Sequence, residues 1–221
     1  MAEELNEFIK KVLLVPNWVA YKGNEEKVNS VVNILQKTFC DDSLDSPDGY
    51  YKEGNVVYII EHFRFGSWET VPNKKNDKKS SIELKEVNRL NRIDIQHLNL
   101  IRHDNVKCEY NFNFYAQNLK EQFQKHYNQI ELYKSNFKKL NIINDKRIIK
   151  IIFCIEDTTL LGNWIFNNEK YILLSPGRCK FFLDIIKNSL KLDVIVTYTE
   201  TNSQLKIVEY IDKTNIDNFI K

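Results

Sequence analysis

Two segments near the start of the chain carry apolar residues at the spacing of an amphipathic helix. The first, Glu3–Leu14, is followed by Pro16, which ends a helix because proline lacks the backbone N–H. The second, Asn24–Cys40, begins with a residue type that caps helices and continues with the acidic pair Glu25 and Glu26, which the helix dipole favours in the first turn. The pattern therefore predicts two helices before the first strand.

A β-hairpin follows. Tyr50–Tyr51 and Val56–Phe65 flank a turn that contains Gly54, a typical hairpin arrangement. The second strand is apolar at nearly every position up to Ile60, which is typical of a central strand covered on both faces. Glu61 then interrupts the apolar run.

The region after the hairpin is mostly helical in pattern. Ser81–Leu100 and Phe112–Leu140 each predict a helix, and together they suggest a helical insertion over about 81–140. Aromatic residues between Tyr115 and Tyr133 recur at helical spacing, so we expect them to pack against the core. Lysines lie among these rings, which leaves base stacking as an alternative role.

Strands and one helix alternate in the last third of the chain. The pattern predicts a strand, a helix, a buried strand and an edge strand, in that order: Arg147–Glu156, Gly177–Leu190, Asp193–Thr199 and Leu205–Ile211. With the insertion set aside, this order predicts an α/β fold. We expect one domain over 1–221, with its core at about 24–65 and 147–211.

Composition narrows the class of protein. The 221 residues are 43% hydrophobic, which is enough for a core and excludes wholesale disorder. Lys+Arg 32 against Asp+Glu 30 gives a net charge of +2, which does not suggest a general polyanion binder. The low glycine content, 6 residues, argues against a glycine-rich nucleotide loop.

We expect no targeting segment in this sequence. The acidic start has no apolar signal region after it, and the longest apolar runs fall short of the roughly 20 residues that a membrane span needs. The cysteines are scattered, with no C-x-x-C pair, so we expect neither a zinc site nor a disulfide framework. We expect a cytoplasmic protein, with Cys154 as a small core residue.

Two acidic residues stand at the hairpin. Asp48 follows Pro47 just before the first strand, and Glu61 ends the apolar part of the second. A hairpin brings these positions together, and two carboxylates so placed can share a divalent cation such as Mg²⁺. A turn-capping role for Asp48, and a strand that simply reaches the surface at Glu61, are the structural alternatives.

Pro-Asp, a gap and a glutamate at the end of an apolar strand resemble the motif of the PD-(D/E)XK nuclease superfamily, which has the restriction-endonuclease-like fold. The resemblance implies a mixed central sheet flanked by helices and a nuclease that hydrolyses phosphodiester bonds of DNA or RNA with Mg²⁺ or Mn²⁺. It implies that Asp48 and Glu61 are the catalytic metal ligands. It also implies a further acid from the first core helix, for which Glu25 or Glu26 is the candidate.

The chain departs from this motif at one position. The superfamily's lysine lies two residues after the glutamate, where this chain has Phe63. Some members supply the lysine from the later core helix, which implies Lys180 or Lys187 here. Without a lysine, weakened catalysis or a non-catalytic module that binds protein or nucleic acid on the same fold is the alternative, such as a mobile-element or toxin-neutralising protein. A homodimer formed through the helical insertion is a further possibility.

Other polar residues have simpler explanations. A lysine-rich surface loop could contact phosphates of nucleic acid or could simply be solvated: Lys74, Lys75, Lys78 and Lys79. Glu156 and Asp157 end the third apolar strand, where they form a turn or line the same cleft as Glu61. Three histidines share no metal-ligand spacing, and we expect structural roles for them: His97, His103 and His126.

Overall fold

The computed structural model describes residues 2–18, 25–40, 47–66, 108–144, 146–158, 164–167, 170–173, 175–200 and 206–216. The helices are α1 (Ala2–Leu13), α2 (Glu25–Gln36), α5 (Cys108–Asn128), α6 (Ile130–Lys139), the 3₁₀ helix η1 (Pro176–Arg178) and α7 (Lys180–Lys187). The strands are β1 (Phe39–Cys40), β2 (Gly49–Glu53), β3 (Val56–Phe65), β4 (Ile148–Asp157), β5 (Trp164–Asn167), β6 (Lys170–Leu173), β7 (Val194–Glu200) and β8 (Lys206–Asp212). None of the described helices combines the length and apolar character that crossing a membrane requires.

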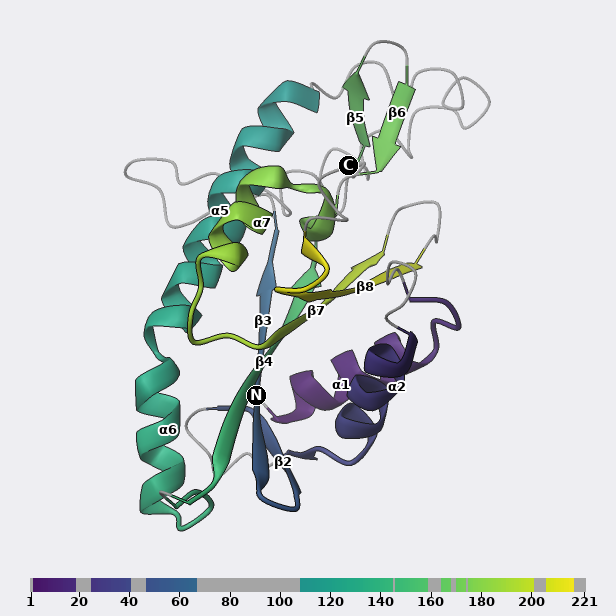
Figure 1. Cartoon of the computed structure of the whole chain (residues 1–221). Coiled ribbons are helices and arrows are strands. Elements are labelled where there is room, and N and C mark those ends of the chain that lie inside the picture. Colours follow the sequence, from purple (N-terminus) through teal and green to yellow (C-terminus); the bar gives the residue numbers. More distant parts are fainter. Residues whose placement is uncertain are drawn as a thin grey trace.

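A six-stranded mixed sheet with the order β1-β2-β3-β4-β7-β8 organises the chain (Figure 1). The central strands β3, β4 and β7 run parallel, and the strands outside them pair antiparallel. This arrangement confirms the α/β class and the predicted hairpin. It also confirms that the last strand lies at an edge of the sheet.

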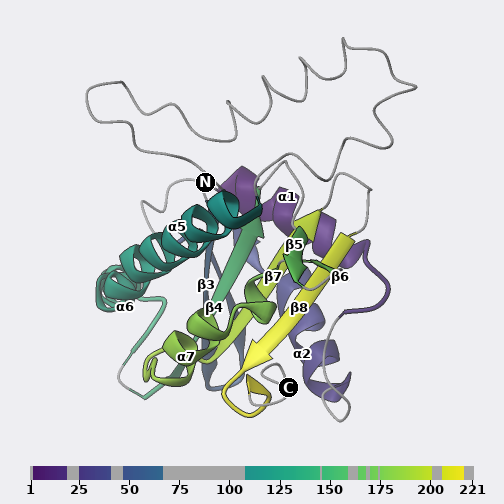
Figure 2. The same ribbon diagram turned by 90° about the horizontal axis from the view of Figure 1, so that it is seen from above.

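Helices cover both faces of the sheet (Figure 2). On β3 the side chains alternate, so Ile59 and Phe63 enter the core under α5, α6 and α7, whereas Tyr58 and Ile60 enter the core under α1 and α2. The continuous apolar run of β3 is thus explained by burial on both faces, as predicted. The two faces matter for the site, because neighbouring residues of one strand belong to different cores.

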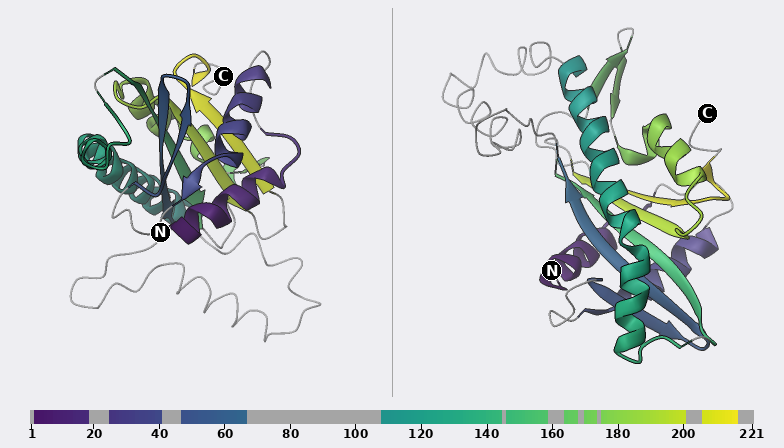
Figure 3. Two further views of the ribbon diagram at one scale, coloured as in Figure 1. Left: turned by 90° about the horizontal axis from the view of Figure 1, so that it is seen from below. Right: turned by 90° about the vertical axis from the view of Figure 1, so that its left-hand side faces the viewer.

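The aromatic helical region forms part of the main core. Tyr115, Phe123 and Tyr133 are buried against the sheet, which confirms the predicted packing of this stripe. The predicted single helix is two helices, α5 and α6, with a break at Gln129 (Figure 3). No glycine or proline lies at this break, and the apolar residues keep their helical spacing across it. The sequence therefore predicts one continuous helix. The predicted helix over 81–100 and the lysine-rich loop lie outside the described residues.

Three features were not predicted. The helix expected over Asn24–Cys40 ends at Gln36, and Phe39–Cys40 form strand β1, which pairs with β2. β5 and β6 pair as a separate two-stranded antiparallel sheet. The helix expected from Gly177 is divided into η1 and α7 by Cys179, whose backbone is extended at φ −92 and ψ 98. Pro176 opens η1, consistent with the preference of proline for the first turn of a helix.

Candidate functional site

Asp48 lies buried at the end of the β2–β3 ladder. Gly49 pairs with Ile60 in the antiparallel register, so Asp48 stands opposite Glu61 just beyond the last backbone pair. The Asp48 Oδ2 atom accepts a hydrogen bond of 2.7 Å from the backbone N–H of His62. The side chain of Asp48 thereby adds one hydrogen bond beyond the last backbone pair and is held at the residue that follows Glu61.

The environment of Asp48 is unfavourable for its charge. Burial is the largest cause that raises the pKa of Asp48, and the neighbouring charge of Glu61 is the second. The hydrogen bond from the backbone of His62 acts in the opposite direction, and the net result is a pKa of about 7. Two carboxylates within electrostatic reach, with one pKa displaced so far, are typical of functional sites as well as of buried structural pairs.

Glu61 carries an unsatisfied oxygen in a dry environment. Only 5% of Glu61 is exposed, and its carboxylate lies under α5 and α6. Oε1 accepts a hydrogen bond of 2.8 Å from the hydroxyl of Tyr133 and lies 2.7 Å from Nδ1 of His126. Oε2 is buried and has no hydrogen-bond partner among the described residues. Because leaving a charged oxygen unpaired in the interior is costly, this atom calls for a cation or a donor.

His126 and Tyr133 reach Glu61 from two different helices. The ring of His126 stacks on Phe63, with centroids 4.4 Å apart and an interplanar angle of 8°. The hydroxyl of Tyr133 also lies 2.9 Å from Oε1 of Gln129, the residue at the break between α5 and α6. Phe63 and Glu61 share one face of β3, so both α5 and α6 contact the same stretch of strand.

The donor set suits a hard cation. Carboxylate oxygens are the ligands that Mg²⁺ prefers, and Mg²⁺ commonly takes one or two carboxylates and keeps several waters. Asp48 and Glu61 provide such a pair, with one buried oxygen of Glu61 unused by protein donors in the described structure. Within the described ranges, no group of three or more His, Cys, Asp or Glu side chains is arranged to hold a metal ion.

The structure does not bring the other expected residues to this pair. Glu25 begins α2, which packs on the opposite face of the sheet from the Glu61 side chain. Lys180 is exposed at the start of α7, directly after Cys179. Through Ser175, this part of the chain is tied to Glu209 of β8, and β8 is separated from β3 by β4 and β7. Lys74, Lys75, Lys78 and Lys79 lie outside the described residues.

His126 and Tyr133 are the residues that sequence reasoning missed. They follow Glu61 by 65 and 72 positions, so nothing local connects them to it. Their mutual spacing of 7 residues was the available signal, because residues i and i+7 share one face in the single helix predicted over Phe112–Leu140. We expect a structural role for His126, and its Nδ1 lies 2.7 Å from Oε1 of Glu61.

Glu156 belongs to a separate ion-pair cluster on the α1 side of the sheet. Its carboxylate is 2.5 Å from Nζ of Lys11 and 2.6 Å from Nε of Arg64. Burial raises the pKa of Glu156, but hydrogen bonds from His62, Lys11 and Arg64 outweigh burial and bring it to about 2. His62 Nε2 is 3.5 Å from the carboxylate, at the limit of hydrogen bonding, so we attribute the effect chiefly to Lys11 and Arg64. Glu156 therefore fastens α1 to the sheet and does not join Glu61.

A third polar cluster ties η1 to β8. The carboxylate of Glu209 accepts hydrogen bonds from Ser175 Oγ at 2.6 Å, the backbone N–H of Gly177 at 2.8 Å and Thr197 Oγ1 at 2.8 Å. Glu209 is 1% exposed, so these donors compensate for the burial of its charge. We call Glu209 and its donors Ser175, Gly177 and Thr197 the clamp between η1 and β8, because they hold these two elements together.

No protein-family model, curated protein or solved structure matches this chain. Function therefore has to be argued from the geometry of its own residues.

Proposed function

We propose that this protein is a divergent metal-dependent nuclease of the PD-(D/E)XK type, with a restriction-endonuclease-like core, that hydrolyses phosphodiester bonds of DNA or RNA. The observation that carries the proposal is the buried pair Asp48 and Glu61, in which Oε2 of Glu61 has no hydrogen-bond partner within the described structure. A divalent cation would relieve both the mutual repulsion and the unsatisfied oxygen.

The residues at this site have two roles in the proposal: some would bind the cation, and others hold those ligands in place. Asp48 and Glu61 would hold Mg²⁺ or Mn²⁺, which when bound polarises a phosphodiester and lowers the pKa of coordinated water. His126 and Tyr133 engage Oε1 of Glu61 and so direct Oε2 toward the ion. The backbone N–H of His62 holds the carboxylate of Asp48 in the same way. Each ligand is therefore supported by a second residue, as metal sites generally require.

The missing lysine makes this nuclease a slow one in our proposal. Position 63 is phenylalanine, and Lys180 is exposed at the start of α7. The imidazole of His126, stacked on Phe63, is the nitrogen group that the structure places at Glu61. Hydrolysis would then depend mostly on the ion, because no amine of the same strand stabilises the charged transition state.

Thermal unfolding with and without MnCl₂ or MgCl₂ tests the proposal. A cation that binds only the folded protein raises the Tm, by an amount that grows with the ratio of cation concentration to Kd. We expect Mn²⁺ to raise the Tm of the wild type and Glu61→Gln to abolish the rise. Glu156→Gln is the matched control, since it removes a buried carboxylate on the opposite face and should leave the metal-induced shift intact.

Cleavage of labelled single- and double-stranded DNA and RNA with Mn²⁺ completes the test. We expect wild-type activity that both Asp48→Asn and Glu61→Gln remove. The proposal fails if Mn²⁺ produces no Tm shift and no cleavage, or if Glu61→Gln keeps both.

A non-catalytic module on the same scaffold is the second candidate. One observation favours it. Phe63, at the position of the motif lysine, stacks on His126, and Oε1 of Glu61 accepts a hydrogen bond from Tyr133, so both already have partners within the protein. The experiment above separates the candidates, because this one predicts nucleic-acid or protein binding without any metal-induced stabilisation.

A further inference from the structure

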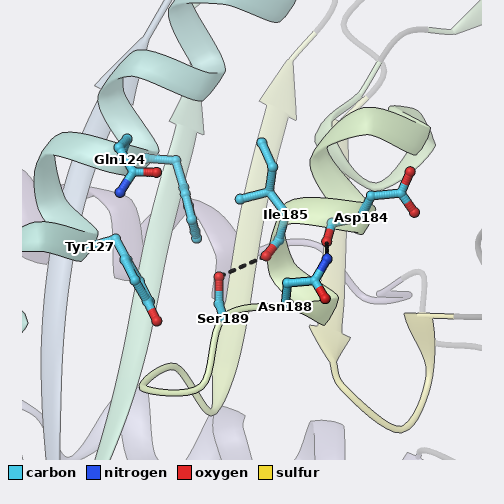
Figure 4. Close-up of a pocket in the computed structure, with 7 residues that line it drawn as sticks. Gln124, Tyr127, Asp184, Ile185, Asn188 and Ser189 are labelled. Atoms are coloured by element: carbon cyan, nitrogen blue, oxygen red, sulfur yellow. Dashed lines mark hydrogen bonds between the residues drawn. The ribbon is translucent and has the colours of Figure 1, made fainter.

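A pocket of about 390 Å³ lies between α5 and α7, on the same face of the sheet as Glu61 (Figure 4). Phe123 and Tyr127 line it from α5, and Ile185 and Ser189 line it from α7 and the residues that follow. In Figure 4 the ring of Tyr127 and the side chain of Ile185 extend into the space between the helices, whereas the carboxylate of Asp184 points away. The interior of the pocket is therefore mainly aromatic and aliphatic.

The aromatic wall of this pocket is rigid. Phe123 and Tyr127 stack with centroids 5.7 Å apart and an interplanar angle of 15°. Phe123 is fully buried and is fixed by edge contacts with Phe153 and Phe182. Tyr127 is only half buried, so it presents a flat ring on a fixed support. A flat ring of this kind suits a second flat π-system.

The polar atoms of the pocket are largely committed to the protein. Asn188 donates its side-chain amide to the backbone of Asp184, and Ser189 donates its hydroxyl to the backbone of Ile185. Few polar atoms of the pocket remain to form hydrogen bonds with a ligand. A ligand would thus be recognised by its flat face more than by its edges.

The helical layer that contains the pocket has more basic than acidic side chains. Residues 115–140 and 178–191 contain nine Lys and Arg side chains and three Asp and Glu side chains. Lys120 lies seven residues before Tyr127, and Lys180 and Lys187 lie four residues before and three after Asp184. Lys120 therefore lies on the face of α5 that carries Tyr127, whereas Lys180 and Lys187 share the face of α7 that carries Asp184, whose carboxylate points away from the pocket (Figure 4).

The other helical layer has no such charge. Residues 2–18 and 25–40 contain four lysines and five glutamates, which gives a slightly negative layer. The net charge of +2 for the chain therefore conceals an uneven distribution between the faces of the sheet. A basic surface with aromatic rings along it is the arrangement that holds single-stranded nucleic acid, with phosphates on the cations and bases on the rings.

We infer that the face formed by α5, α6 and α7 binds single-stranded nucleic acid, with one unpaired base stacked on Tyr127 in the pocket. A duplex cannot supply this base, because its bases already stack on one another. The inference deepens the proposed function by naming a single-stranded substrate. It rests on that function for cleavage only, since binding to this face needs no metal.

The pocket and the carboxylate site are connected through α5. Tyr127 follows His126, whose Nδ1 lies 2.7 Å from Glu61. Consecutive helical residues point about 100° apart, so the base pocket and the Glu61 site lie on adjacent sides of one helix.

Fluorescence anisotropy with a labelled oligothymidylate and a duplex of equal length tests the inference, with EDTA present to prevent hydrolysis. We expect the single strand to bind more tightly, and Tyr127→Ala to weaken its binding about tenfold or more, as loss of one base-stacking ring does. Tyr127→Phe should bind like the wild type. Tyr127→Leu keeps the apolar packing but removes the ring, so it should also bind weakly.

Charge is tested by a matched pair of double variants. Lys120→Gln with Lys180→Gln should weaken binding and reduce its salt dependence, whereas Lys10→Gln with Lys37→Gln, on the other layer, should change neither. Equal binding by wild type, Tyr127→Ala and Tyr127→Leu would overturn the inference, as would a preference for duplex. If these variants lose binding while wild type shows no metal-dependent cleavage, the inference stands and the nuclease proposal fails.

Discussion

The imidazole of His126 lies flat on the ring of Phe63, with the two centroids 4.4 Å apart, while its Nδ1 reaches Oε1 of Glu61 at 2.7 Å. Phe63 is the position at which the resemblance leads us to expect a lysine. A helix that is distant in sequence thus supplies the nitrogen group that β3 lacks. One side chain, His126, thus makes both a packing contact with Phe63 and a polar contact with Glu61. Substitution of His126 tests the two contacts together.

A double-mutant cycle measures that contact. We expect His126→Phe to lower the free energy of unfolding by about 1–3 kcal/mol, because the stacking is kept but a buried carboxylate oxygen loses a partner. In a Glu61→Gln background the same change should cost clearly less, because the charge that His126 faces has been removed. Urea unfolding of the four proteins gives the coupling energy. Equal costs in both backgrounds would show that His126 contributes packing alone.

Asp48→Asn should stabilise the metal-free protein at high pH. The pKa of Asp48 is about 7 in the folded protein because of burial and the charge of Glu61, against 3.8 for an unperturbed aspartate. Below 3.8 the side chain is neutral in both states, and stability is then lost as the pH rises through 7, because the folded state must ionise a buried acid.

The Tm advantage of Asp48→Asn over wild type should therefore grow between about pH 4 and about pH 8. Thermal unfolding in EDTA across this interval checks it. Asp184→Asn, which changes an exposed carboxylate, serves as the control. A difference that does not vary with pH would contradict the assignment of the buried charge to Asp48.

Glu156→Gln should have the opposite pH profile. Burial raises the pKa of Glu156, but the hydrogen bonds from Lys11 and Arg64 outweigh burial and lower it from 4.5 to about 2. The stabilisation is thus present above pH 4.5 and is lost as the pH falls toward 2. We expect the variant to be less stable than wild type near neutral pH and to approach it in acid, as measured by urea unfolding at several pH values. A loss of stability that stays constant into acid would show that the ion pairs with α1 are not its cause.

Gly177→Ala should destabilise the clamp between η1 and β8. A Cβ atom at this position would lie 2.6 Å from Oε1 of Glu209, whose carboxylate is already held by Ser175, Thr197 and the Gly177 amide. Because the carboxylate cannot move without losing hydrogen bonds, we expect a cost of about 1–3 kcal/mol in the free energy of unfolding.

Gly54→Asn is the matched control for this change. Gly54 has φ +55 and open space around it, and asparagine tolerates that backbone conformation. It should therefore be nearly neutral in the same urea experiment. A Gly177→Ala protein as stable as wild type would mean that Glu209 can rearrange freely.

Local periodicity was sufficient to predict much of the fold. The hairpin, the continuous apolar run of β3 and the edge position of β8 follow from patterns within a few residues. The proximity of Asp48 and Glu61 could also be predicted from a local pattern, because the antiparallel register across one short turn determines which positions face each other. The break at Gln129 and the β5–β6 pair lay beyond this reasoning, because no glycine or proline marks the break and each strand of the pair has only four residues.

Tertiary packing decided which residues surround the pair. The loops that join a helix to its neighbouring strands decide which face of the sheet the helix covers. The spacing of residues along the sequence carries little information about this choice of face. The α2 helix covers the face away from the Glu61 side chain, so Glu25 does not join the site, and α5 and α6 cover the near face, so His126 and Tyr133 do. The charge difference between the two helical layers arises in the same way: the sequence by itself determined the numbers of charges, and only the folded sheet separated them onto opposite faces.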